Sequence, residues 1–384
     1  DCHIGGWREE KLKKIGLESL KKAAEICIQE NVAFLLIAGD LFNTSLPEID
    51  LVKEVAHIFS TLKEADISIY VIPGSHDFSP SGKTMLDVFE RSGLVTNVMK
   101  FHEGKLQFTE DKTGTKITGL YGRWSSLEKI DYASLKKDHL EQEPGFKIFM
   151  FHTTLEEFKP KGFENIEGES YTTMPKFFNY YAGGHVHYRF DIEKEGYRKI
   201  VYPGPLFPNN FKELEELKQG SICIVDERSN VKRFPIKIKD VEVVNIDVNK
   251  KASWEAKEII ESELNKRNIK DKIVALRVSG ELTSGKISDI NFNAIGSDSD
   301  AYVILKNINK LTTKTSEKID VKGESKEEIE ETLIKEQKVE LENQEKLTKQ
   351  LMIILAEEKH EGETNTDFEN RIVQNVKKVV QNEN

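Results

Sequence analysis

The stretch that decides the fold is Ala33–Ala38 (AFLLIA), which leads directly into Gly39-Asp40-Leu41-Phe42 (GDLF). A short, continuous apolar run that ends at a glycine is typical of a buried strand. The acidic residue directly after it lies where a strand passes into a loop. Functional side chains often lie at such positions, because the sheet holds the loops in place.

Strands and helices alternate around this stretch. Leu12, Ile15, Leu20, Ala23 and Cys27 follow helical spacing, and Pro47–Glu64 and Lys83–Arg91 are predicted helices. The further predicted strands are Ile67–Ile72, Lys116–Tyr121, Phe146–Phe151, Tyr180–Gly183, Lys199–Tyr202 and Ser221–Val225. This order predicts an α/β fold in which two sheets form a sandwich flanked by helices.

Four segments follow from the change of pattern along the chain. Residues 1–237 form the α/β domain, and residues 238–306 are expected to form a small α+β domain. In the small domain, strands are predicted at Val241–Val248, Lys272–Ser279 and Ala301–Leu305, and helices at Trp254–Asn268 and Lys286–Asn293. Residues 307–323 are polar and are interpreted as a linker. Residues 324–384 are expected to form two helices, which begin at the capping boxes Ser325/Glu328 and Thr366/Glu369.

Composition limits the class of protein. The 384 residues carry a formal net charge of −10, and residues 320–384 alone account for −7. The rest of the chain is therefore nearly neutral, and its charge does not exclude a nucleic-acid partner. No apolar run approaches the roughly 18 residues that would cross a bilayer. The three cysteines lie far apart and suggest a reduced interior, so the expected location is the cytoplasm.

Metal-ligating residue types recur after the predicted strands. They lie in Asp1-Cys2-His3, Gly39-Asp40, Pro73-Gly74-Ser75-His76-Asp77, the lone His152, and Gly183-Gly184-His185-Val186-His187. Residues two positions apart on an extended segment point to the same side. The pairs Asp1/His3 and His185/His187 could therefore each reach one metal. Mixed nitrogen and oxygen ligands suit manganese, iron or zinc, and Asp40 is the natural carboxylate to bridge two ions.

Each motif alone would more often be a turn, a surface pair or a core histidine. Together they hold five of the nine histidines. The remaining histidines, His57, His102, His139 and His360, have no such setting. The combination therefore predicts a dinuclear centre for phosphoester hydrolysis.

This ordered set resembles the calcineurin-like metallophosphoesterase superfamily. The resemblance implies that Asp1, His3 and His187 hold one metal, and that Ser75, His152 and His185 hold the other. It implies that Asp40 bridges the two and that a water between them is the nucleophile. It also implies that His76 protonates the leaving oxygen or stabilises the charged transition state.

Further details resemble the SbcD-type (Mre-type) DNA double-strand-break repair nucleases: Gly39-Asp40-Leu41-Phe42, Asp1-Cys2-His3-Ile4-Gly5, and Tyr202-Pro203-Gly204-Pro205 with Phe211, Glu213 and Lys218–Val225. This implies two Mn²⁺ ions and exonuclease or endonuclease action on duplex and single-stranded DNA ends. It also implies that the small domain caps the cleft.

The same resemblance implies protein partners. The C-terminal helices would bind the coiled coil of an SbcC-type ATPase, with Phe368, Ile372 and Val376 facing it. Helices Pro47–Glu64 and Lys83–Arg91 would join two copies into a homodimer, although ordinary packing on the sheet explains them equally well. No membrane partner is expected. The resemblance implies a location near the nucleoid, or in the nucleus if the protein is eukaryotic.

Three features depart from the family pattern. Ser75 stands where the family usually has Asn, and Asn43 stands where many members have His; Asn43 and Asp77 are expected to lie just behind the ligands. The sequence also begins at a ligand, so it is expected to be a fragment that lacks the preceding strand, with Asp1 poorly anchored. Two alternatives stay open: another phosphatase or phosphodiesterase of the superfamily, or a weakly active scaffold that binds DNA ends. Arg123 and Trp124 are candidate DNA contacts.

Overall fold

The computed structural model describes residues 1–77, 84–122, 129–161, 166–296, 299–313, 350–351, 353–354 and 365–381. Two compact units divide the chain. The first holds residues 1–78 and 84–314, and the second holds residues 79–83 and 315–384. Among the described residues, no helix has the length and apolar character needed to span a bilayer.

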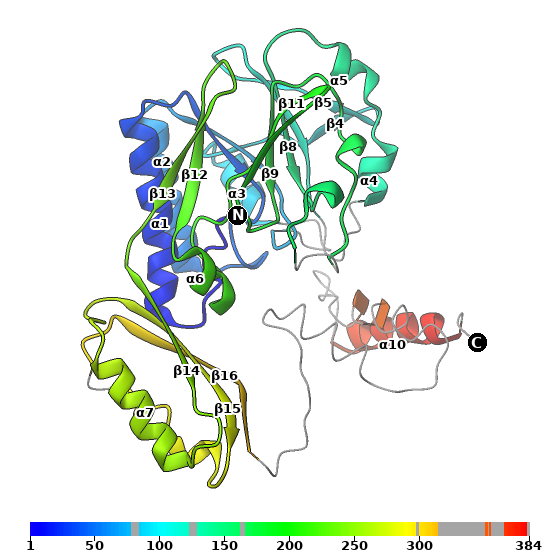
Figure 1. The fold of residues 1–384 in the computed structure, drawn as a ribbon. Coiled ribbons are helices and arrows are strands. Elements are labelled where there is room, and N and C mark those ends of the chain that lie inside the picture. The colour runs from blue at the N-terminus through cyan, green and yellow to red at the C-terminus, as the bar shows by residue number, and fades with distance from the viewer. Residues whose placement is uncertain are drawn as a thin grey trace. The chain divides into compact units, whose positions relative to one another are not determined.

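The first sheet of the larger unit is parallel, in the order β1 (Phe34–Ala38), β2 (Ser68–Ile72), β3 (Thr96–Asn97). Side chains on β1 alternate between two cores. Ile37 packs with helices α1 (Glu10–Gln29), α2 (Ile49–Glu64) and α3 (Met85–Arg91), whereas Leu36 faces the second sheet. Both faces of β1 are covered, which explains why its sequence is apolar throughout. Figure 1 shows α1 and α2 beside the hairpin of β12 (Gly220–Val225) and β13 (Val231–Ile236).

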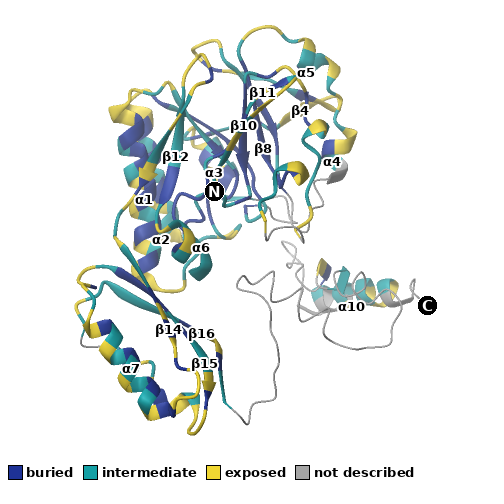
Figure 2. Ribbon diagram, in the orientation of Figure 1, coloured by how far each residue is buried: buried dark blue, intermediate teal, exposed yellow. Residues whose placement is uncertain are grey.

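The second sheet has six strands in the order β10-β11-β9-β8-β7-β6. Its bounds are β6 (Thr109–Glu110), β7 (Lys116–Leu120), β8 (Lys147–His152), β9 (Tyr180–Gly184), β10 (Phe190–Lys194) and β11 (Tyr197–Tyr202). Met150 on β8 and Ile72 on β2 share the core between the two sheets, and Phe149 and Tyr181 face an aromatic core on the far side. Buried residues accordingly concentrate on the strands (Figure 2). The predicted two-sheet α/β sandwich is confirmed.

Shorter elements cover the edges of this sandwich. They are β4 (Lys100–His102), β5 (Lys105–Gln107), α4 (Lys129–Ser134), α5 (Asp138–Gln142), two 3₁₀ turns at Glu156–Phe158 and Tyr171–Thr173, and α6 (Phe211–Leu217). The strands β1, β2, β8 and β9 carry the polar motifs at their carboxyl ends. The β1/β2 and β8/β9 pairs are each parallel, so the motifs within a pair meet at one edge.

The small domain is a three-stranded parallel sheet, β14 (Val241–Asp247), β15 (Ile273–Leu282) and β16 (Val303–Thr313), with α7 (Ser253–Asn265) packed on it. The predicted helix at Lys286–Asn293 is only a 3₁₀ turn, Ile287–Ile290.

The predicted linker of residues 307–323 is wrong at its start, because β16 continues to Thr313. A register shift between Arg277 and Ser279 of β15 inserts an extra residue in β16. That shift moves the apolar positions from Ile304 and Ile308 to Leu311, so the sequence does not alternate as a regular strand would.

The second unit contains α10 (Asn365–Gln381), which confirms the last predicted helix. Phe368, Ile372 and Val376 are partly buried on it, and the Arg371 guanidinium lies 5.3 Å from the Phe368 ring centroid. The helix predicted to begin at Ser325 lies outside the described residues, apart from a few positions near its predicted end.

Candidate metal centre

The turn after β1 sets the geometry of the site. Gly39 has a φ of +87°, and a Cβ atom there would lie 2.2 Å from Nδ1 of His152. Glycine is therefore required both by its backbone conformation and by the close approach of the imidazole. Asp40 follows with a φ of 50°, which turns its side chain away from the strand direction and into the site.

Two other motifs also bend where an extended backbone was predicted. His3 has a φ of 45° and His185 a φ of 87°, so neither Asp1/His3 nor His185/His187 lies on an extended segment. The expected reason for their proximity is wrong, although the side chains do gather. Main-chain bonds hold the first motif against the second. The N–H groups of Cys2 and His3 donate to the Asp40 carbonyl at 2.8 and 2.9 Å.

Asp1 is firmly held, contrary to expectation. Its Oδ1 atom accepts a hydrogen bond from the His185 N–H at 2.8 Å, and its carbonyl accepts one from Leu206 N–H at 2.9 Å. The carboxylate is nearly inaccessible, at 1% side-chain exposure. The loop after β9 and the segment after β11 thus anchor it.

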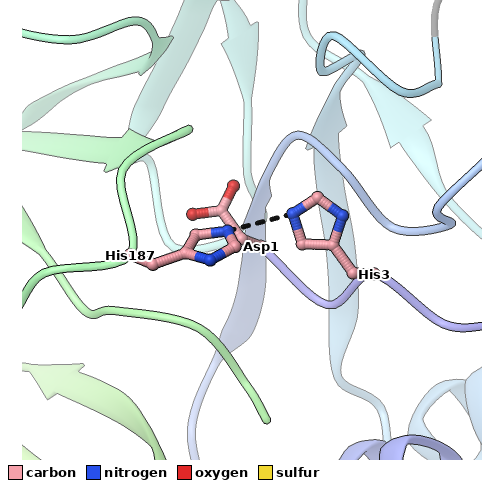
Figure 3. A group of neighbouring side chains, drawn as sticks. All are labelled: Asp1, His3 and His187. Atoms are coloured by element: carbon pink, nitrogen blue, oxygen red, sulfur yellow. Dashed lines mark hydrogen bonds between the residues drawn. The ribbon is translucent and has the colours of Figure 1, made fainter. Parts of the chain in front are cut away.

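Asp1, His3 and His187 form one group whose potential ligand atoms all lie within 4.8 Å of one another (Figure 3). The Nε2 atoms of His3 and His187 are 3.0 Å apart. Two nitrogens bound at right angles to one ion, at about 2.1 Å each, would also be about 3 Å apart. The spacing therefore fits a shared metal ligand set.

Asp40 belongs to two further groups, one with His3 and His76 and the other with Asp1 and His152. Its Oδ2 atom lies 3.6 Å from His3 Nε2 and 3.2 Å from His152 Nε2, while Oδ1 accepts from the His76 N–H at 2.8 Å. Burial opposes the ionisation of Asp40, but the attraction of His152, His3 and His76 outweighs it and holds the pKa of Asp40 well below its usual value. The carboxylate is thus central to the cluster and ionised.

His152 is oriented by β1. Its Nδ1 atom lies 2.7 Å from the Ala38 carbonyl oxygen, which can only accept, so Nδ1 carries the hydrogen and Nε2 faces Asp40. Burial lowers the pKa of His152, but Asp40 and the Ala38 carbonyl raise it more.

His185 lies beside His152, with ring centroids 5.1 Å apart, but it enters none of the ligand groups found among the described residues. Burial and the neighbouring His152 lower the pKa of His185 to about 3, so its ring is neutral and can offer a lone pair.

The motif after β2 surrounds Asp40. Ser75 Oγ lies 3.4 Å from Asp40 Oδ2, and His76 Nδ1 lies 3.0 Å from the main-chain oxygen of Asn43. The Asn43 side chain points elsewhere, because its Oδ1 accepts from Asn209 Nδ2 at 3.3 Å. Asn43 thus orients His76 through its main-chain oxygen. The residue type at position 43 does not predict this contact.

Asp77 ties two loops together. Its carboxylate accepts N–H bonds from Leu41 at 3.2 Å, Phe42 at 3.3 Å and Gly74 at 3.1 Å. Burial and the nearby Asp40 raise the pKa of Asp77 to about 6. Asp77 therefore fixes the loop after β1 against the loop after β2, behind the potential ligands.

Glu213 is a site residue to which the sequence assigned no role. Its Oε1 lies 2.7 Å from Nδ1 of His187, so the carboxylate fixes the hydrogen on Nδ1 and leaves Nε2 facing His3. Burial disfavours its charge, but His187 and bonds from Asn209 and Asn210 hold the pKa of Glu213 below its usual value. The position appeared in the Tyr202–Val225 segment, but no spacing rule linked it to His187.

The donor set fits divalent metals. Among the described residues, two buried potential ligand atoms of the cluster, Asp1 Oδ2 and His152 Nε2, form no hydrogen bond. Leaving such atoms unpaired costs free energy unless something binds them. Imidazole nitrogens and carboxylate oxygens together suit manganese, iron or zinc.

The predicted DNA contacts Arg123 and Trp124 lie outside the described residues. His139 takes an ordinary structural role, since its Nε2 lies 2.8 Å from the carbonyl oxygen of Leu106.

The chain is similar to several known proteins. Residues 1–189 match the family model for calcineurin-like phosphoesterases. The DNA double-strand break repair protein Mre11 of Methanococcus maripaludis is 26% identical over 355 residues, which cover 87% of each chain. Mre11 of Sulfurisphaera tokodaii is 26% identical over 81% of this chain and 76% of its own.

A third relative is the uncharacterized metallophosphoesterase YhaO of Bacillus subtilis, 26% identical over 53% of this chain and 48% of its own. The match to the family model and the recurrence of Mre11 proteins among the relatives agree with the fold and the buried cluster. Residues 1–189 therefore match the calcineurin-like phosphoesterase family, and the relatives of this chain include Mre11 DNA double-strand break repair proteins.

Proposed function

We propose that this chain is a metal-dependent nuclease that processes DNA double-strand breaks, as an exonuclease on duplex ends and an endonuclease on single strands. The observation that carries the proposal is the similarity to M. maripaludis Mre11 over 87% of both chains, which extends beyond the phosphoesterase domain into the small domain. The buried cluster at the ends of β1, β2, β8 and β9 supports the chemistry.

The residues would hold two divalent ions, with Mn²⁺ as the expected metal. Asp1, His3 and His187 would bind one, Ser75, His152 and His185 the other, and Asp40 both. When bound, the ions would lower the pKa of a water and neutralise phosphate charge. Glu213 and the Ala38 carbonyl would keep Nε2 of His187 and of His152 free to act as ligands.

His76 is the proposed acid. Its Nδ1 is occupied by the Asn43 carbonyl, so Nε2 is the atom that can deliver a proton to the leaving oxygen. The Asn43 side chain has no titratable proton near neutral pH, so it would not assist His76 in moving a proton. The ring lies edge-on to His3 at 4.9 Å, next to the proposed metal position.

Two protein partners belong to the proposal. Large apolar side chains are exposed at the start of α2 and on α3, with Leu46 at 66%, Ile49 at 77% and Val88 at 54% exposure. These residues favour a homodimer through the two helices. Helix α10 would bind the coiled coil of an SbcC-type ATPase, and its partly exposed Phe368, Ile372 and Val376 would supply the apolar face.

A substrate comparison tests the nuclease proposal. With Mn²⁺ present, the protein should degrade linear duplex DNA and open hairpin ends, and it should lose this activity with a chelator or in Asp40→Asn. Bis(p-nitrophenyl) phosphate serves as the small diester. Fast turnover of that ester with no action on DNA would refute the nuclease proposal and favour another phosphodiesterase.

A second candidate is a weakly active scaffold that binds DNA ends with the ATPase. Ser75 favours it, because a hydroxyl is a shorter and poorer neutral ligand than an amide oxygen, and its Oγ is 3.4 Å from Asp40 Oδ2. DNA-end binding with cleavage no faster than in Asp40→Asn would support this candidate.

A further inference from the structure

Helix α6 contacts both the candidate metal centre and the small domain. Glu213 and Glu215 lie two positions apart on this short helix, so their side chains point to different neighbours. Glu213 reaches His187 in the cluster, and Glu215 reaches Arg277 on β15. Within about one helical turn, α6 therefore contacts a potential metal ligand through Glu213 and the small domain through Glu215.

The ion pair with the small domain is bidentate. Arg277 Nε lies 3.0 Å from Glu215 Oε1, and Nη2 lies 2.6 Å from Oε2. The guanidinium carbon also lies 5.2 Å from the Phe211 ring centroid, at the first residue of α6. The two side chains are only 16% and 14% exposed, so water screens the pair weakly. Arg277 therefore contacts α6 at its first residue, Phe211, and near its middle, at Glu215.

The helix has little freedom to shift by itself. Leu214 is fully buried in an apolar cluster with Leu12 and Ile15 of α1 and Ile273 of β15. Asn210 caps the helix by accepting the Glu213 N–H at 2.9 Å, and Glu213 Oε2 accepts from Asn209 N–H at 2.8 Å. A displacement of β15 would therefore be passed to the Glu213 carboxylate through packed groups.

We infer that Arg277 of the small domain is a positioning residue for His187, acting through Glu215, helix α6 and Glu213. The position of the small domain is thereby coupled to the affinity of one metal position, the one that uses His187. The inference rests on the metal centre of the proposed function, and it adds a residue that lies outside the potential ligand groups among the described residues.

A Mn²⁺ titration followed by electron paramagnetic resonance tests this inference, because the free ion gives a strong signal that is lost on binding. The variants are Glu213→Gln, Arg277→Ala and Arg277→Lys in the full chain. Tyr302→Phe is the matched control, since Tyr302 Oη donates to the Lys11 carbonyl of α1 at 3.2 Å, and Phe keeps the ring while it removes this polar bond between the small domain and α1.

Glu213→Gln should weaken one Mn²⁺ equivalent by about 10–100-fold and leave the other unchanged. Arg277→Ala should weaken the same equivalent by about three- to tenfold, Arg277→Lys should recover part of that loss, and Tyr302→Phe should stay within about twofold of the wild type. Melting in a chelator, where no metal contributes, identifies any variant that has lost its fold.

The outcomes separate the inference from the proposed function. If the wild type binds Mn²⁺ and Arg277→Ala behaves like Tyr302→Phe, or both equivalents weaken together, the coupling is refuted and the metal centre stands. If the wild type binds no Mn²⁺, the metal centre of the proposed function is refuted, and the coupling with it.

Discussion

Nδ1 of His152 lies 2.7 Å from the carbonyl oxygen of Ala38, the last residue of β1. The two residues belong to different sheets of the sandwich, since His152 ends β8. The bond therefore joins the sheets at the cluster itself, and it directs Nε2 of His152 toward Asp40. A main-chain atom makes the contact, so it persists whatever side chain occupies position 38.

Asp40→Asn should abolish metal binding. Asp40 takes part in two of the three potential ligand groups, and an amide carries no charge to attract a cation. Wild-type protein at about 100 times the Kd of Mn²⁺ should gain about 2.7 kcal/mol of stability, seen as a Tm rise of a few degrees. The variant should show no rise. Asp191→Asn, at an exposed carboxylate on β10, is the control and should keep it. A full rise in Asp40→Asn would contradict the assignment.

Ser75→Asn should strengthen metal binding. The longer side chain presents an amide oxygen, a better neutral ligand for a hard cation than a hydroxyl. We expect the weaker Mn²⁺ equivalent to tighten on the order of tenfold, with a parallel gain in nuclease rate. Ser75→Thr keeps the hydroxyl and should show no gain. Equal affinities in wild type, Asn and Thr variants would remove position 75 from the ligand set.

His76→Gln should slow catalysis without loosening the metals. Removal of a general acid typically costs about a hundred- to ten-thousandfold in rate. The measurement is kcat on duplex DNA beside Mn²⁺ affinity. His76 also lies within ligand reach of His3 and Asp40. A loss of Mn²⁺ affinity in this variant would therefore identify His76 as a ligand instead of an acid.

Tyr70 should make stability fall in alkali. Burial and its bond to Asp111, with Oη donating to Oδ2 at 2.8 Å, raise the pKa of Tyr70 from 10.0 to about 12. Between these values the folded protein keeps a proton that the unfolded chain has lost. The contribution of Tyr70 to the free energy of unfolding is therefore complete below the pKa of the unfolded chain, and it is lost as pH rises through the pKa of the folded protein.

The corresponding test is urea unfolding at about pH 8 and about pH 11. Tyr70→Phe has no phenol to ionise, so its free energy of unfolding should fall less between the two pH values than that of the wild type. Equal falls in both proteins would show that Tyr70 does not contribute.

Ile372→Glu should disrupt the proposed ATPase contact. Ile372 lies on the same face of α10 as Phe368 and Val376, and a buried charge there would be unpaired. We expect at least about tenfold weaker binding of the SbcC-type ATPase in a pull-down titration. Gln374→Glu adds the same charge at an exposed position of α10 and should leave binding unchanged. Undiminished binding by Ile372→Glu would direct the search to another surface.

The sandwich could be predicted because apolar runs such as Ala33–Ala38 are long enough to mark strands, and because polar motifs follow their ends. The grouping of Asp1, His3 and His187 was implied by the family resemblance, but the backbone geometry that brings them together was not predicted. His3 and His185 adopt positive φ values, which residues other than glycine rarely do, and no local sequence rule predicts them.

Other features depend on contacts between distant segments. Glu213 meets His187 across 26 residues, and nothing in either segment alone predicts the pair. β16 was missed beyond residue 306 because its register shift breaks the alternation that identifies strands. Such features depend on tertiary packing, which local sequence patterns do not encode.

The sheet order β10-β11-β9 has a consequence for where the domain can be cut. The family match ends at residue 189, yet β11 pairs with β9 inside the second sheet, and Leu206 beyond it binds the Asp1 carbonyl. A fragment trimmed at the homology boundary would keep every histidine of the cluster. It would also bare the edge of β9 and remove Leu206, which binds the Asp1 carbonyl, and Glu213, which binds His187. Ile236 at the end of β13 is buried in the same core as Ile37 of β1, so a fragment meant to keep this centre should extend to Ile236 and not end at the homology boundary.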